Sequence, residues 1–250
     1  MTVPQLVGHR GYPKYYPENT LCGLEAAAPG ACFVEVDVQL TKDMVPVVIH
    51  DSELKRTAGR RGSVLDMEYA AVKGIVVDER ERLGKAFDNA RLPALGEVAA
   101  WVGRHPALHL FVEIKRASLV RFGRTAVVDR VLQDLSPIIE RAIVISFDFD
   151  AVRLARVAGA PAVGWVMGAW DDESLALLQD LSPEYVFCDY TRIPAALQTL
   201  PAGPWQWALY DVVDPQAALD WGRRGASLIE TWAIGEMLAH PLLGQRACGR

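Results

Sequence analysis

The chain has few cysteines and no long apolar run. Its four cysteines, Cys22, Cys32, Cys188 and Cys248, are scattered among 250 residues without a CxxC pair. This spacing excludes a zinc-ribbon pattern and argues against a disulfide framework, so we expect reduced thiols. No apolar run approaches the roughly 18 residues of a membrane span, and the N-terminus lacks a basic segment followed by an apolar stretch. We therefore expect a cytoplasmic protein without stable membrane association.

An excess of positive charge is also missing. The 26 Lys and Arg residues are outnumbered by 31 Asp and Glu residues, which gives a formal net charge of −5. Nucleic acids recruit basic faces, so this balance predicts no nucleic-acid partner, and it offers no polybasic patch for a membrane surface. An anionic phosphodiester can still bind such a chain where a metal ion inverts the local charge.

Short apolar, β-branched segments alternate along the chain with amphipathic or alanine-rich segments. This alternation predicts βαβ units and a parallel sheet, and eight strands in a chain of this length predict a closed (β/α)8 TIM barrel. The expected strands lie at residues 5–9, 33–39, 109–115, 142–147, 162–167, 185–189, 206–210 and 227–230. The expected helices lie at residues 20–28, 95–104, 120–135, 148–157, 171–181, 193–200 and 215–224.

Residues 51–92 interrupt this alternation of strand-like and helix-like segments. They carry many charges and little strand pattern, and they are too numerous for one connecting loop. We predict that they form a small insertion after an early strand, with an additional strand at residues 45–49. No linker, internal repeat or low-complexity tract is visible, so we expect a single domain over residues 1–250.

Three carboxylates stand within strand-like apolar segments. Glu35 and Asp37 are two residues apart in CFVEVDVQL and therefore project from the same strand face. Glu113 occupies a similar position in LHLFVEIK. An exposed strand can carry such a pair as plain solvated charge, but the continuous apolar neighbours indicate a buried parallel strand. Oxygen ligands select hard cations, so the three residues are candidate ligands for Mg²⁺ or Ca²⁺.

Histidines and cations follow the same apolar segments. His9 and His50 each end a strand-like run and can give or take a proton near neutral pH, although a hydrogen-bonded structural histidine is the commoner case. Arg10 presents a planar fork suited to phosphate oxygens, and Lys115 can neutralise charge at phosphorus or pair with an acid. Glu18 belongs either to the site or to the start of the following helix.

Several motifs together resemble those of the glycerophosphodiester phosphodiesterases. They are GHRGYPKYYPENTLCGLEAA, FVEVDVQLTKDMVPVVIHDSELKRT, LPALGEV, FVEIK and VISFDFDAVRLAR, dense over residues 6–57 and weaker towards the C-terminus. The resemblance implies a TIM barrel with a small insertion after an early strand. It also implies a metal held by Glu35, Asp37 and Glu113, an acid and base pair in His9 and His50, and phosphate contacts from Arg10 and Lys115.

The reaction implied by the resemblance is hydrolysis of a small glycerophosphodiester to glycerol 3-phosphate and an alcohol such as choline, ethanolamine or glycerol. The attacking group is either the adjacent glycerol hydroxyl, which gives a cyclic phosphate, or water activated by the metal. Two other functions stay open: a lysophospholipase D- or C-like activity on membrane lipids, and a non-catalytic phosphate-binding barrel. Retention of both histidines and all three carboxylates favours catalysis. The sequence leaves a monomer and a homodimer open.

The chain departs from the family pattern near its C-terminus. Residues 207–210 read Trp-Ala-Leu-Tyr where many relatives read Trp-Thr-Val-Asn, and residues 229–232 read Ile-Glu-Thr-Trp where many end the strand with Thr-Asp. Loops at this end of a barrel set substrate choice. The departures fall at Leu209, Tyr210, Glu230 and Thr231, and the candidate pocket residues are Trp170, Tyr210 and Trp232, whose rings either receive a trimethylammonium group or pack internally.

Overall fold

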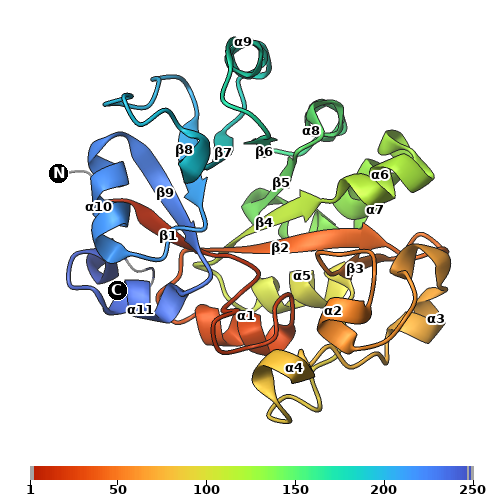
Figure 1. Cartoon of the computed structure of the whole chain (residues 1–250). Helices are drawn as coiled ribbons and strands as arrows, with labels where there is room; N and C mark the ends of the chain where they lie inside the picture. Colours follow the sequence, from red (N-terminus) through yellow and green to blue (C-terminus); the bar gives the residue numbers. More distant parts are fainter. Residues whose placement is uncertain (1–2, 247, 249–250) are drawn as a thin grey trace.

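The computed structural model describes residues 3–246 and 248, and its centre is a closed barrel of eight parallel strands. Strand β1 pairs with both β9 and β2, which closes the sheet and confirms the predicted TIM barrel (Figure 1). The barrel strands are β1 (Gln5–Gly8), β2 (Phe33–Leu40), β4 (His109–Ile114), β5 (Ala142–Ser146), β6 (Val163–Met167), β7 (Tyr185–Asp189), β8 (Gln206–Tyr210) and β9 (Ala226–Thr231). The predicted additional strand is β3 (Pro46–Val48), antiparallel to β2.

Helices surround the barrel (Figure 1). They are α1 (Leu21–Ala27), α5 (Leu95–Gly103), α6 (Arg116–Phe122), α7 (Arg124–Leu135), α8 (Phe149–Val157), α9 (Asp172–Leu181), α10 (Pro215–Arg223) and α11 (Ile234–Ala239). Side-chain caps fix several starts; for example, the carboxylate of Asp148 accepts from the backbone N of Ala151. None of the helices described combines the length and apolar character of a membrane span.

Two helix predictions were wrong. The helix expected over residues 120–135 is divided into α6 and α7 at Gly123, whose φ of +84° is a left-handed conformation that suits glycine. The helix expected over residues 193–200 is absent, and only a short 3-10 turn, η3 (Tyr190–Arg192), precedes it. There the backbone N of Leu200 donates to the carbonyl of Arg224, so the chain is held against the end of α10 instead of coiling on itself.

The segment at residues 51–92 forms a compact annex to one side of the barrel, drawn in orange and yellow in Figure 1. It contains α2 (Lys55–Ala58), η1 (Val64–Asp66), α3 (Tyr69–Val72) and α4 (Arg80–Leu83). Its buried apolar residues form one hydrophobic cluster with Val47 of β3 and with Ile49. The annex members of this cluster are Leu54, Val64, Val72, Ile75, Val77 and Leu92.

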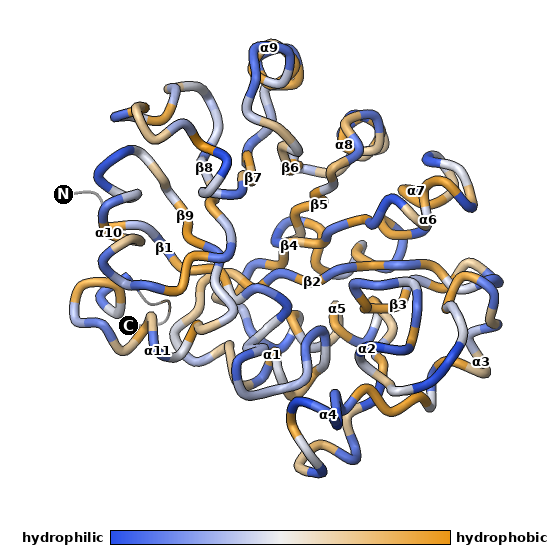
Figure 2. The backbone as a smooth tube through the Cα atoms, viewed as in Figure 1, coloured by the Kyte–Doolittle hydropathy of each residue, from blue (hydrophilic) through white to orange (hydrophobic). Residues whose placement is uncertain are grey.

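The strands bury both faces, which explains their nearly continuous apolar sequences. Figure 2 shows strands such as β5 in hydrophobic colours, whereas helices α8 and α9 carry both kinds of residue. Outward-facing side chains such as Val34 and Val36 meet the helices, and inward-facing ones such as Phe111 and Phe187 fill the barrel. The rings of Phe111 and Phe187 lie 4.9 Å apart edge to face. The interior therefore provides an apolar floor beneath the strand ends.

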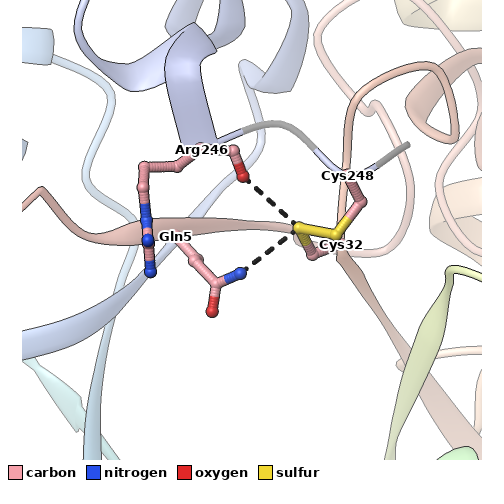
Figure 3. The surroundings of a disulfide bond; sticks show 4 residues. All are labelled: Gln5, Cys32, Arg246 and Cys248. Atoms are coloured by element: carbon pink, nitrogen blue, oxygen red, sulfur yellow. Dashed lines mark hydrogen bonds between the residues drawn. A yellow bond between two sulfur atoms is a disulfide. The ribbon is translucent and has the colours of Figure 1, made fainter. Parts of the chain in front are cut away.

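A disulfide joins Cys32, just before β2, to Cys248 in the C-terminal segment (Figure 3). The prediction of reduced thiols was therefore wrong for this pair; Cys22 and Cys188 are free. Gln5 Nε2 donates to Cys32 Sγ at 3.4 Å. The two cysteines are 216 residues apart, so their spacing gave no sign that the chain end returns to the start of β2. Disulfides persist in oxidising compartments, so this pair gives no support to the cytoplasmic prediction.

Candidate active site

Chemically active side chains gather where the parallel strands end. His9 directly follows β1, and Asp37 in β2 stands beside Glu113 in β4, its register partner. Lys115 follows β4, and His50 follows β3 closely. Because all barrel strands run in one direction, their carboxyl ends meet at one face, which is where TIM barrels carry their sites. Residues far apart in the sequence are thus brought together by topology alone.

Glu35, Asp37 and Glu113 form an acidic cluster at this face. One ligand atom from each lies within 4.8 Å of the other two. Glu35 is 2% exposed and Asp37 is fully buried, and among the described residues Oε1 of Glu35 has no hydrogen-bond partner. Buried carboxylates need a counter-charge, and an all-oxygen donor set fits a hard divalent cation. The cluster could hold such an ion.

Asp37 forms ion pairs with two cationic side chains of this face. Arg10 Nε lies 2.9 Å from its Oδ2, and Lys115 Nζ lies 3.0 Å from its Oδ1. Asn19 Nδ2 donates to Oδ2 at 2.8 Å, while the backbone N of Asp37 donates back to the Asn19 side chain at 3.0 Å. Burial opposes ionisation of Asp37, but Arg10 and Lys115 outweigh it and hold the pKa of this carboxyl below its ordinary value. Asp37 is therefore a fixed anion.

The other buried carboxylates of this face have too few cations beside them to balance their negative charge. Burial, reinforced by Asp37 and Glu230, raises the pKa of Glu35 well above its ordinary value. Burial also raises the pKa of Glu113, although Lys115 Nζ donates to its Oε1 at 2.7 Å. Burial raises the pKa of Glu230 to about 7. The shared cause is negative charge removed from water without enough cations beside it, a condition that a bound divalent ion would relieve.

Each of the two histidines is held by a carboxylate at Nδ1. His9 Nδ1 lies 3.2 Å from Asp211 Oδ1, and His50 Nδ1 lies 2.6 Å from Asp51 Oδ1. A carboxylate on Nδ1 favours the proton there and leaves Nε2 as the free lone pair. Burial lowers the pKa of His9, but Glu230 and Asp211 more than offset burial, so that the net pKa lies above its ordinary value. Both rings line one pocket.

An ion-pair network ties the annex to this face. Arg56 in α2 grips Glu18 with two nitrogens, at 2.7 and 2.8 Å, and reaches Asp51 Oδ2 with Nε at 2.7 Å. Arg10 Nη1 lies 3.3 Å from the same Glu18 carboxylate, which is 8% exposed. Glu18 is thus enclosed by two guanidinium groups. The network also includes Asp51, which holds His50.

A pocket of about 170 Å³ opens between the histidines and the apolar floor. It is lined by His9, Arg10, His50, Glu113, Lys115, Ile145, Phe147, Val166, Phe187, Tyr210, Asp211 and Glu230. Of the three aromatic candidates, Tyr210 is in this lining, while Trp232 borders a separate depression together with Glu18. Trp170 is in neither lining; its ring packs 5.4 Å from that of Trp207.

Sequence reasoning missed several residues of the face. Glu230 carried the same signal as Glu35, a charge near the end of an apolar strand, but was treated only as a departure from the family. Asp211 follows β8 with a φ of +65°, a conformation that no local sequence feature announced. Nothing in the sequence signalled that the Asn19 amide bonds Asp37. Arg56 belongs to the annex, whose placement the sequence did not reveal.

Comparison with known proteins gives a consistent picture. Residues 9–179 match the model of the "Glycerophosphoryl diester phosphodiesterase family". The chain is 34% identical over 161 residues to protein YqiK of Bacillus subtilis, which covers 62% of this chain and 63% of that protein. It is 34% identical over 149 residues to a glycerophosphodiester phosphodiesterase of Caldanaerobacter subterraneus, covering 59% and 60%. The alignments thus span less than two thirds of these relatives' lengths.

Among solved structures, an Oleispira antarctica phosphodiesterase in complex with the product sn-glycerol-3-phosphate is similar in fold. The TM-score is 0.80, with coverage of 95% of this chain and 96% of the other. The sequence identity of 21% limits this likeness to the fold.

The raised pKa of Glu230 predicts a pH dependence of stability in metal-free protein. Because its folded pKa of about 7 exceeds the unfolded value, the folded state binds more protons between about pH 4.5 and 7, and stability falls as pH rises through this window. Glu230→Gln removes this loss, so at pH 8 in chelator the variant should be more stable than the parent by up to about 3 kcal/mol. At pH 4 it should gain nothing from this source.

Urea unfolding at the two pH values measures this difference. The control is Glu81→Gln, which removes an equal charge from an exposed position in α4 and should show no such pH-dependent gain. Equal pH slopes for Glu230→Gln and the parent would contradict the assignment of a raised pKa to Glu230.

Proposed function

The chain belongs to the glycerophosphoryl diester phosphodiesterase family, and we propose that it hydrolyses small glycerophosphodiesters to glycerol 3-phosphate and a free alcohol. The observation that carries this proposal is the buried acidic cluster of Glu35, Asp37 and Glu113 beside two carboxylate-held histidines at one pocket. Such an arrangement offers a cation site, a place for phosphate and two proton-transfer groups within one small space. The pocket's modest volume suits a compact diester.

We propose Mg²⁺ or Ca²⁺ as the cation held by Glu35, Asp37 and Glu113, because all their donors are oxygens. When bound, such a cation supplies Lewis acidity and positive charge beside the phosphoryl oxygens. The unpartnered Oε1 of buried Glu35 supports the fit of these residues to the ion.

Arg10 and Lys115 are the proposed phosphate contacts. Both line the pocket, and both are already held by Asp37, at 2.9 and 3.0 Å. Glu18 steadies Arg10 from the other side. Donors fixed in this way need little rearrangement when a phosphate arrives, and they oppose the charge that develops on its oxygens during reaction.

His9 and His50 are the proposed acid and base. One Nε2 takes the proton of the attacking hydroxyl as the new oxygen–phosphorus bond forms. The other imidazole gives a proton to the departing alcohol oxygen as its bond to phosphorus breaks. Asp211 and Asp51 orient the rings through Nδ1. The attacking hydroxyl is that of water or of the adjacent glycerol carbon. In the second case the first product is a cyclic phosphate, which water then opens to glycerol 3-phosphate while the two histidines exchange roles.

We also propose that barrel and annex act as one catalytic domain. Arg56 lies in the annex, yet it binds both Glu18, which steadies Arg10, and Asp51, which orients His50. A separate annex would leave Glu18 buried with less counter-charge.

The activity itself is tested by measuring glycerol 3-phosphate release from glycerophosphocholine, glycerophosphoethanolamine and glycerophosphoglycerol. We expect release with Mg²⁺ or Ca²⁺ present, its loss in chelator, and its recovery when the ion is returned. Undiminished release in chelator would contradict the cation's role, and no release from any diester under all conditions would overturn the proposed function.

Replacing either histidine tests the acid and base assignment. His9→Asn and His50→Asn should each lower kcat by about 10²–10⁴, the usual contribution of a positioned proton-transfer group. His105→Asn is the matched control, because His105 lies at the end of α5 and bonds the carbonyl of Trp101 away from the pocket. A variant at His9 or His50 with near-parental kcat would remove that residue from the mechanism.

A further inference from the structure

Glu35 belongs to two groups of candidate ligands. Beyond the acidic cluster, His9, Glu35 and Glu230 also place one ligand atom each within 4.8 Å of the others. A metal–ligand bond of about 2.1 Å allows ligand atoms up to about 4.2 Å apart, so small side-chain rotations would bring this second group around one ion. Glu230 has no part in the acidic cluster, and Glu113 and Asp37 have none in the second group.

The carboxylate of Glu230 independently indicates a ligand-binding position. Its carboxylate is 4% exposed, and within residues 3–246 and 248 its Oε1 has no hydrogen-bond partner. No lysine or arginine among these residues forms an ion pair with it, because Arg10 and Lys115 are directed to Asp37, Glu18 and Glu113. A buried carboxylate that lines a pocket and has no partner is normally completed by a cation or a donor from a ligand.

His9 is oriented as metal-ligating histidines are. Its Nδ1 is engaged by Asp211, and its Nε2 lies 3.9 Å from Glu35 Oε2. Carboxylate–histidine–metal arrangements use the Nδ1 partner in this way to fix the tautomer and to raise the basicity of the ligating nitrogen. The same geometry serves proton transfer, so His9 is suited to both roles but not to both at once.

We propose that His9, Glu35 and Glu230 form a second cation site, which shares only Glu35 with the acidic cluster, prefers Zn²⁺ and blocks catalysis when filled. One imidazole nitrogen and two carboxylates are an ordinary Zn²⁺ donor set, whereas the acidic cluster offers oxygen alone and suits harder ions. The inhibitory part rests on the proposed function. A zinc ion on Nε2 occupies the lone pair that would otherwise take up a proton.

Direct binding tests the site without reference to activity. Parent protein saturated with Mg²⁺ is titrated with Zn²⁺ by calorimetry, and the metal content is measured after dialysis. We expect one equivalent of Zn²⁺ to bind in addition to Mg²⁺. Glu230→Gln should weaken Zn²⁺ binding at least about 10-fold. Glu113→Gln should weaken Mg²⁺ binding and leave Zn²⁺ binding within about 2-fold, because Glu113 belongs to the acidic cluster alone.

The charge control is Glu81→Gln, an exposed position in α4 without an ion-pair partner among the described residues, which should bind both metals as the parent does. The proposal is overturned if the Mg²⁺-saturated parent binds no further Zn²⁺. It is also overturned if Zn²⁺ binding depends on Glu113 and not on Glu230. The parent titration alone decides the first point even if a variant fails to fold.

Inhibition is then measured at saturating Mg²⁺, with each protein's rate divided by its own rate without Zn²⁺. Micromolar Zn²⁺ should inhibit the parent, and Glu230→Gln should need at least about 10-fold more. Zinc that binds at Glu230 without slowing turnover would overturn the inhibitory role. A parent that hydrolyses no diester would overturn the proposed function instead, while the binding titration would still decide the site.

Discussion

The arrangement of charges at the C-terminal face of the barrel depends on the two ion pairs that Asp37 forms with Arg10 and Lys115. Asp37 is fully buried, and these two cations, together with the Asn19 amide, let it stay ionised there. The same pairs withdraw the cations from Glu35, which is left with a backbone donor and a distant imidazole. The face therefore holds more buried negative charge than its own side chains neutralise, and this deficit is what suits it to a divalent cation.

The barrel explains why that deficit is tolerated. Parallel pairing fixes Asp37 beside Glu113, and closure of the sheet holds both at the face where the strands end. Below them, Phe111 and Phe187 form an apolar floor that strengthens every electrostatic interaction above it. Burying the charges lowers the folding stability locally, and the burial of the extensive apolar core of the barrel offsets this loss.

Much of the fold could be predicted from the sequence, because each buried parallel strand is a short apolar run and the runs alternate with helices. Glu35 and Asp37 were recognisable because i and i+2 share a strand face. The pairing of Cys32 with Cys248, the route of residues 193–200 and the packing of Trp170 depend on contacts between distant segments, which no local pattern encodes. The family resemblance supplied roles, but not the partners of His9 or the isolation of Glu230.

The central claim is that Glu35, Asp37 and Glu113 hold one divalent cation together. Crystals grown in Mn²⁺ and measured on both sides of the manganese absorption edge would test it most directly, since the anomalous difference locates the ion without reference to activity. The account predicts a single strong peak in contact with carboxylate oxygens of all three residues. A well-diffracting crystal with no peak there, or with manganese bound only elsewhere on the chain, would contradict it.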